Sequence, residues 1–115
     1  MHELGLVQRI LEIAEAYARR EGARAIRLIG LKVGALSGVE KSALEFVFEA
    51  AKQGTLAEKA RLAVNWVPPV SFCKGCNVEF EVDNPFGIAL CPLCNEPSAT
   101  LRQGQELEVE YLEVV

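Results

Sequence analysis

The chain has 115 residues and a formal net charge of −4, with 50% hydrophobic and 24% charged residues, which is ordinary composition for a globular protein. It has no apolar run long enough to form a membrane-spanning helix. The first residues lack the basic start and apolar centre of a signal peptide. We therefore expect a cytoplasmic protein in which cysteines stay reduced.

The first predicted element is an amphipathic helix over about residues 4–21. Its apolar side chains recur at three- and four-residue steps, which places them on one face. Gly22 is a natural stop, and Arg19 and Arg20 fall in the last turn, where the helix dipole favours cations. The apolar face comprises Leu6, Val7, Ile10, Leu11, Ala14, Tyr17 and Ala18.

A strand and a second helix are predicted next. Residues 25–33 are apolar on both alternations apart from Arg27 and Lys32, which is typical of a central or covered strand. Ser37 and Glu40 have the spacing of a capping box, which predicts a helix over about residues 39–53. Its inward residues are expected to be Leu44, Val47, Phe48 and Ala51.

Two further strands complete the predicted elements. Residues 61–67 show the alternation of a strand, and Pro68-Pro69 then ends the ladder because neither proline can donate a backbone hydrogen bond. Residues 105–115 alternate apolar side chains with glutamates, which predicts a strand with one solvated face. The apolar faces are expected to carry Leu62, Val64 and Trp66 in the first, and Leu107, Val109 and Tyr111 in the second.

All four cysteines lie between these two strands, as Cys73-x2-Cys76 and Cys91-x2-Cys94 with fourteen residues between the pairs. Each C-x2-C can wrap a tight turn that points two sulfurs inward. Two such turns facing each other supply the four thiolates of a tetrahedral structural zinc site. The segment from residue 73 to residue 102 is acidic on balance, whereas a phosphate backbone attracts a basic face, so we expect no nucleic-acid partner.

Three other interpretations of the four cysteines stay open at this point. Two disulfides would use the same cysteines, although a reducing cytoplasm disfavours them. A zinc ribbon can serve only as a scaffold or adaptor between proteins. Cys91-Pro-Leu-Cys94 also resembles a rubredoxin knuckle, which would make the chain an iron-binding electron carrier.

Together these elements predict an α+β fold, with a small three-stranded sheet and two helices that carry an inserted zinc-ribbon module. The α/β domain is expected to comprise residues 1–68 and 104–115. The zinc-binding domain is expected to comprise residues 69–103.

The chain has one histidine, His2, which excludes sites that need two histidines from one chain. No glycine-rich phosphate loop and no paired-carboxylate motif stands out, so we expect no enzymatic activity and no catalytic residues. The amine of Met1, the next backbone nitrogen and the imidazole of His2 can chelate one ion, and Glu3 can add a nitrogen or an oxygen. Such a planar, nitrogen-rich set suits nickel(II) or copper(II). By position alone, a frayed helix start is the favoured explanation of these residues, with Glu3 placed by the helix dipole.

The whole chain resembles the HypA/HybF family of hydrogenase-maturation proteins. The resemblance rests on Met1-His2-Glu3-Leu4 at the start, the stretch 33–39 (VGALSGV), residues 44–48, the four-cysteine ribbon and residues 104–107 (GQEL) near the end. The N-terminal tripeptide and the ribbon are specific in combination, whereas either alone would not be.

The resemblance implies a nickel metallochaperone that carries Ni(II) as a transient cargo at Met1, His2 and Glu3. It implies structural zinc on the four cysteines, and an α/β nickel-binding domain joined to a zinc domain. The implied partners are a HypB-type GTPase and the large-subunit precursor of [NiFe]-hydrogenase, and some family members form homodimers. Some members also supply a second histidine from near the zinc module, which this chain lacks.

Overall fold

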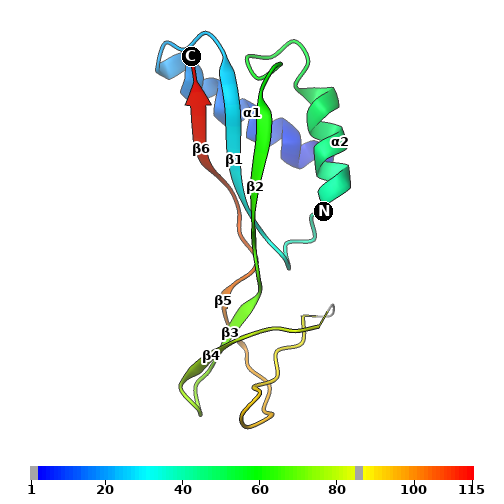
Figure 1. Cartoon of the computed structure of the whole chain (residues 1–115), viewed down its shortest axis with the longest axis vertical. Helices are drawn as coiled ribbons and strands as arrows, with labels where there is room; N and C mark the ends of the chain where they lie inside the picture. The colour runs from blue at the N-terminus through cyan, green and yellow to red at the C-terminus, as the bar shows by residue number, and fades with distance from the viewer. Residues whose placement is uncertain (1–2, 85–86) are drawn as a thin grey trace.

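The computed structural model describes residues 3–84 and 87–115, and the molecule extends over 54 × 26 × 16 Å. Both helices lie toward one end of its long axis and the shortest strands toward the other (Figure 1). None of the helices in the described ranges is long and apolar enough to span a membrane. In order, the elements are α1 (Glu3–Arg20), β1 (Ile26–Gly34), α2 (Lys41–Ala51), β2 (Arg61–Val67), β3 (Val70–Cys73), β4 (Val78–Glu81), β5 (Thr100–Gln103) and β6 (Leu107–Val114).

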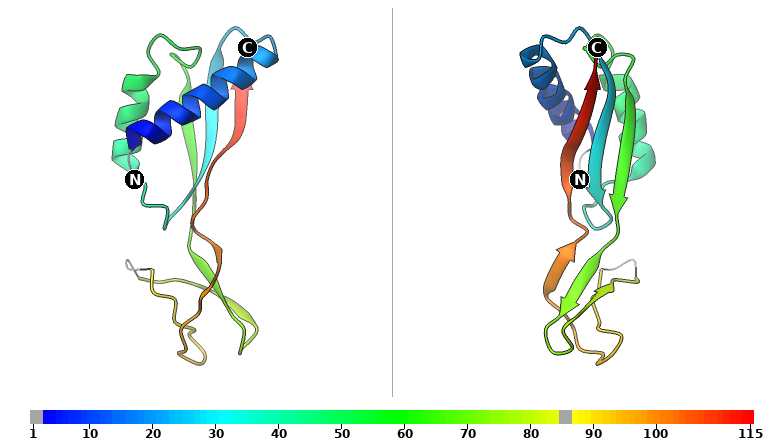
Figure 2. Two further views of the ribbon diagram at one scale, coloured as in Figure 1. Left: turned by 180° about the vertical axis from the view of Figure 1, so that it is seen from behind. Right: turned by 60° about the vertical axis from the view of Figure 1, so that its left-hand side comes forward.

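The first sheet has the strand order β2-β1-β6. β1 pairs in parallel with β2 and antiparallel with β6. Parallel neighbours need a crossover connection, which α2 provides between β1 and β2. Both helices lie on the same face of this sheet (Figure 2). This confirms the predicted α+β fold with a three-stranded sheet and two helices.

The main core lies between this sheet and the two helices. Alternate residues of β1 (Ile29, Leu31 and Val33) are buried, and Leu44 and Phe48 of α2 are completely enclosed. Burying side chains of this size contributes about 1.5–3 kcal/mol each. The predicted apolar face of β2 also packs against this core. The residues that α1 contributes to the core are Val7, Ile10, Leu11, Ala14 and Ala18.

The predicted inward face of the last strand is wrong at Tyr111. The register of β6 against β1 shifts between Val109 and Tyr111, so Glu110 is an extra residue at a β-bulge. A bulge reverses the facing of all residues beyond it, and Leu112 rather than Tyr111 packs against the core. The Tyr111 ring instead lies against the backbone of Gly30, where any Cβ would collide with it.

The predicted capping box is also wrong. The residue that caps α2 is Glu40, whose carboxylate accepts a hydrogen bond of 2.6 Å from the backbone N–H of Ala43. Ser37 accepts instead from the N–H of Val39, in the turn that precedes the helix. The chain between them includes Gly38 with φ +84, a conformation that cannot continue into a helix. The helix therefore starts two residues later than the sequence pattern indicates.

The inserted stretch has a second three-stranded sheet, β4-β3-β5, which the sequence analysis did not predict. β3 is central and pairs antiparallel with both neighbours. Each of these strands has four residues, too few to show a clear alternation. β3 and β4 form a hairpin across the first cysteine turn, whereas β5 pairs with β3 from a distant part of the chain, which no local pattern reveals.

The two sheets meet where the chain crosses from β2 to β3 and from β5 to β6. Leu36, in the loop after β1, donates its N–H to the carbonyl of Gly104, with an N···O distance of 2.7 Å. Gly104 has φ +124, and a Cβ there would lie 2.7 Å from Cα of Pro69. A Cβ at Gly87, in the inserted stretch, would lie 3.3 Å from the Leu36 side chain. Close backbone approach therefore joins the two sheets.

Candidate metal centre

The described residues contain one group of three or more potential metal ligands, and it consists of the four predicted cysteines. Their Sγ atoms all lie within 4.8 Å of one another. Cys73 lies at the end of β3, and its Sγ is 3.7 Å from that of Cys94. None of the four forms a disulfide, which would require sulfurs about 2 Å apart.

The spacing of the sulfurs fits one tetrahedral ion. With metal–sulfur bonds of about 2.3 Å, the corners of a tetrahedron lie about 3.8 Å apart. The separation of 3.7 Å between the Sγ atoms of Cys73 and Cys94 agrees with this geometry. Cys73 and Cys91 are buried, Cys76 is half-buried and Cys94 is exposed. The cluster is therefore a metal-binding arrangement with one side open to solvent.

A repeated asparagine supports both cysteine turns. Asn77 follows Cys76 and Asn95 follows Cys94, and these two have positive φ angles of 56° and 60°. Asparagine enters this left-handed region more readily than other residues with a side chain, apart from aspartate. The sequence therefore contains C-x2-C-N twice, a signal that the sequence analysis missed. The asparagines allow each turn to reverse the chain directly after its second cysteine.

Hydrogen bonds hold the second cysteine turn against the sheet. The N–H of Cys91 donates to the carbonyl of Glu96 at 3.0 Å, which closes the turn. The hydroxyl of Ser98 donates to the carbonyl of Phe72 in β3 at 2.6 Å. Arg102 lies over the ring of Phe72, 4.3 Å from its centre. These contacts bring the two cysteine pairs together from opposite ends of the inserted stretch.

Hydrogen bonds from backbone N–H groups and from neighbouring thiols separate the pKa values of the cysteines. The backbone N–H of Cys94 lowers the pKa of Cys91 to about 7. The hydrogen bond with the Cys94 side chain raises the pKa of Cys76 to about 12. At neutral pH, these thiols by themselves therefore carry only part of the possible negative charge. Because a metal ion binds thiolates, it would release the remaining protons on binding.

Of the three residues predicted to bind nickel, the structure describes only Glu3, since Met1 and His2 lie outside the described residues. Glu3 opens α1, and its carboxylate accepts a long hydrogen bond of 3.4 Å from the backbone N–H of Glu40. The start of the first helix therefore lies beside the start of the second. Glu40 is an acidic neighbour of Glu3 that the sequence analysis did not connect with it.

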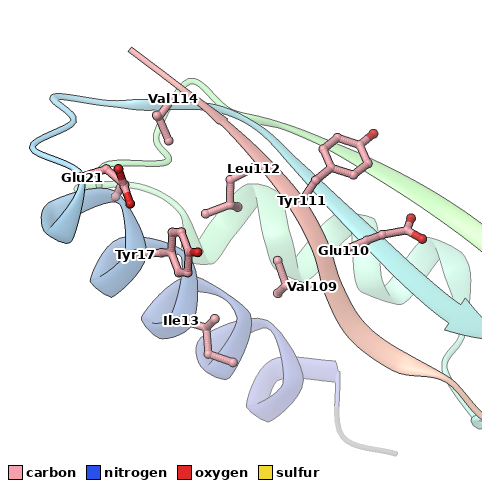
Figure 3. A pocket seen from close by; sticks show the side chains of 9 residues that line it. Ile13, Tyr17, Glu21, Val109, Glu110, Tyr111, Leu112 and Val114 are labelled. Atoms are coloured by element: carbon pink, nitrogen blue, oxygen red, sulfur yellow. The ribbon is translucent and has the colours of Figure 1, made fainter.

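A groove between α1 and β6 has a volume of about 500 Å³ (Figure 3). Ile13 and Tyr17 project from the helix, and Val109 and Leu112 project from the strand toward them. Its lining contains no thiol, imidazole or amine, and Glu21 lies at one end. It is therefore an apolar surface rather than a site for chemistry.

Comparisons with known proteins match this chain over nearly its whole length. Residues 1–114 match the family described as "Hydrogenase/urease nickel incorporation, metallochaperone, hypA". Two curated relatives are named hydrogenase maturation factor HypA. The one from Geobacter sulfurreducens is 43% identical over 114 residues, and the alignment covers 99% of each chain. The one from Picosynechococcus sp. is 39% identical over 115 residues, and the alignment covers 100% of each chain.

Among solved structures, the chain is similar to the solution structure of the Ni metallochaperone HypA from Helicobacter pylori. The TM-score is 0.70 at 24% identity, with 100% of this chain and 98% of that chain covered. At this identity the similarity supports the fold. With the match over residues 1–114 and full-length relatives near 40% identity, the chain belongs to the HypA family of hydrogenase maturation factors.

Proposed function

We propose that this protein binds nickel(II) at Met1, His2 and Glu3 and delivers it during maturation of [NiFe]-hydrogenase. The main support is that the match to a nickel-incorporation family begins at residue 1 and so includes this tripeptide. The terminal amine, a backbone nitrogen and the imidazole of His2 form the planar nitrogen set that nickel(II) accepts. The protein acts in this proposal as a carrier and not as an enzyme.

The contact between Glu3 and Glu40 supports an oxygen ligand at the same place. The carboxylate of Glu3 is held by one long, exposed hydrogen bond, so turning it toward an ion costs little. Glu40 adds a second carboxylate at the neighbouring helix start. Such oxygens can complete the nickel site in a chain with no second histidine, and a site of mixed ligands suits release as well as binding.

We further propose that the four cysteines hold zinc in a structural role. Four soft thiolates that fill all four positions of a tetrahedral site are typical of structural zinc. The separate sheet of residues 70–103 supports a division into an α/β nickel-binding domain, residues 1–68 and 104–115, and a zinc-binding domain, residues 69–103.

The proposed partners are a HypB-type GTPase and the large-subunit precursor of [NiFe]-hydrogenase, which meet this protein in the cytoplasm. The family description and the names of the relatives support a place among maturation factors. An acidic chain with net charge −4 supports protein partners over nucleic acid. A homodimer is compatible with this function.

A nickel titration of the purified, untagged protein tests the proposal. The native chain should bind one nickel ion, and both His2→Ala and one extra residue before Met1 should abolish that binding. Glu3→Gln keeps the backbone nitrogen but loses the charge, so it should weaken binding only if the carboxylate is a ligand. Glu12→Gln, on the same helix, is the matched control. Unchanged affinity in His2→Ala would refute the proposal.

Two further measurements separate the alternatives. Nickel binding should weaken as pH falls below about 6.5, because the imidazole must be neutral to bind. Elemental analysis should find one zinc ion per chain in the colourless protein as purified. Zinc without specific nickel binding would support a scaffold or adaptor, and a red protein that contains iron would support an electron carrier.

A further inference from the structure

A second groove lies between the two helices. We call it the α1/α2 groove; it is open to solvent and has a volume of about 680 Å³. Leu11 of α1 and Val47 of α2 lie inside it, and Leu4 and Phe46 stand along it. Its lining therefore combines an apolar interior with large apolar side chains next to solvent.

Phe46 is unusual for a surface residue. It is 75% exposed, whereas its neighbour Phe48 on the same helix is 1% exposed and belongs to the main core. Leu4 is 48% exposed. Large apolar side chains that stand together on a surface mark interaction sites, and aromatic residues often dominate the binding energy. Because Phe46 contributes little to the fold, its exposure points to contact with another molecule.

The charge of the groove indicates the chemistry of that molecule. The lining includes two carboxylates, Glu12 and Glu15, and no lysine or arginine. Glu15 already accepts from Arg19 and from the backbone N–H of Leu56. Glu12 forms no ion pair or hydrogen bond within the part of the chain that the structure describes. A basic partner would complement it, whereas two copies docked groove to groove would bring these acids together.

The position of the groove connects it with the proposed nickel site. Leu4 follows Glu3 directly, so a protein that fills the groove lies beside the N-terminus. We infer that the α1/α2 groove is the docking surface for the protein that exchanges nickel with this chain. The partner inserts an apolar side chain beside Phe46 and places lysine or arginine near Glu12. This inference rests on the proposed nickel function.

The test uses the purified HypB-type GTPase of the same organism as the probe, with binding measured by calorimetry. Phe46→Ala should weaken the affinity at least about tenfold, the effect expected for a central aromatic anchor. Its melting temperature should stay unchanged. The matched control is Tyr17→Ala, which removes an aromatic side chain that is 53% exposed in the other groove and should leave the affinity unchanged.

Charge substitutions give a second arm. Glu12→Lys should weaken binding about as strongly as Phe46→Ala and should reduce its dependence on salt. Glu113→Lys makes the same charge change on an exposed residue of β6 and should have little effect. Equal affinity of the native chain, Phe46→Ala and Glu12→Lys for the GTPase would overturn the inference, as would a GTPase that does not bind the native chain.

Two controls keep this result separate from the nickel proposal. Phe46→Ala should bind nickel like the native chain, because it leaves Met1, His2 and Glu3 intact. Binding of the GTPase that depends on Phe46 supports the docking surface even if the nickel titration fails. Sedimentation of the native chain and Phe46→Ala tests another occupant. A dimer that Phe46→Ala dissociates would assign the groove to a second copy and overturn the inference.

Discussion

The sheets β2-β1-β6 and β4-β3-β5 both have three strands, but their interiors differ. The buried cluster beside the first sheet contains residues from both helices and from β1, all of them apolar. The buried cluster of the second contains Phe80 and two cysteines, Cys73 and Cys91. A few buried side chains cannot offset the loss of chain entropy in the inserted stretch. The first sheet is therefore stabilised by apolar burial, and we expect the second to depend on a metal at the four cysteines.

The two sheets also differ in which elements cover them. The first sheet is covered on one face by helices, which supply the apolar side chains that it buries. The second has no helix among the described residues, and in our proposal bonds from the four cysteines to a central ion stabilise it instead. Each of the following predictions would sharpen or break this comparison.

Metal removal should have the largest effect. Binding of a structural zinc ion contributes about 10–16 kcal/mol to small metal-dependent modules, far more than a cluster of three buried residues can supply. A strong chelator should therefore collapse the amide NMR dispersion of residues 70–103 and leave that of α1, α2 and β1 in place. Added zinc should restore the spectrum. Persistent dispersion of Phe72 and Phe80 after complete metal loss would break the comparison.

Phe48→Ala should destabilise the first sheet by about 3–5 kcal/mol, because it opens a cavity in a completely enclosed position. Denaturant unfolding followed by the fluorescence of Trp66, which packs against the same core, measures the loss. The zinc content of the folded protein should not change. The matched control is Phe46→Ala, two residues away and exposed, for which we expect a change within about 0.5 kcal/mol.

Gly104→Ala tests the junction of the two sheets. Its φ of +124 is strained for any residue with a Cβ, at a cost of about 1–3 kcal/mol, and the Cβ would also collide with Pro69. Gly22→Ala introduces a Cβ at φ +70 with no atom within 4 Å, so it pays only the conformational cost. Thermal unfolding should show a larger loss for Gly104→Ala, and equal losses would argue against tight contact at the junction.

The smallest expected effect concerns the pH dependence of α2. Hydrogen bonds from the Ser42 hydroxyl and the Ala43 N–H lower the pKa of Glu40 from its ordinary value of 4.5. The ionised carboxylate therefore stabilises the fold above that value, and its contribution is lost as pH falls through the lowered pKa. Glu40→Gln should remove this part of the acid sensitivity, seen as a smaller drop in melting temperature on acidification. An unchanged drop would show that the cap contributes nothing measurable.

Local patterns in the sequence were sufficient for the long elements. The apolar periodicity of α1 and the apolar run of β1 are repeated over enough residues to be read directly. The four cysteines could also be identified as one cluster, because two C-x2-C pairs separated by fourteen residues are typical of a single metal site. The short strands β3, β4 and β5 could not, since four residues hold too little periodicity to separate a strand from a loop.

The errors in the sequence analysis arose where two distant segments decide the outcome. Tyr111 continues a perfect alternation in sequence, yet the bulge at Glu110 turns it to the opposite face. The bulge depends on how β6 pairs with β1, and Gly30 leaves room for the ring. Likewise Ser37 and Glu40 have the spacing of a capping box, but after the turn through Gly38 it is Glu40 that caps the helix.

By itself, then, the sequence determined the helices, the strands of the first sheet, the grouping of the four cysteines and the likeness to a family. Each of these depends on residue type and spacing within a short stretch. Only the tertiary structure decided the second sheet, the facing of Tyr111, the contact of Glu3 with Glu40 and the groove beneath Phe46. These depend on which segments far apart in the chain come together, because pairing and burial are set by the whole fold.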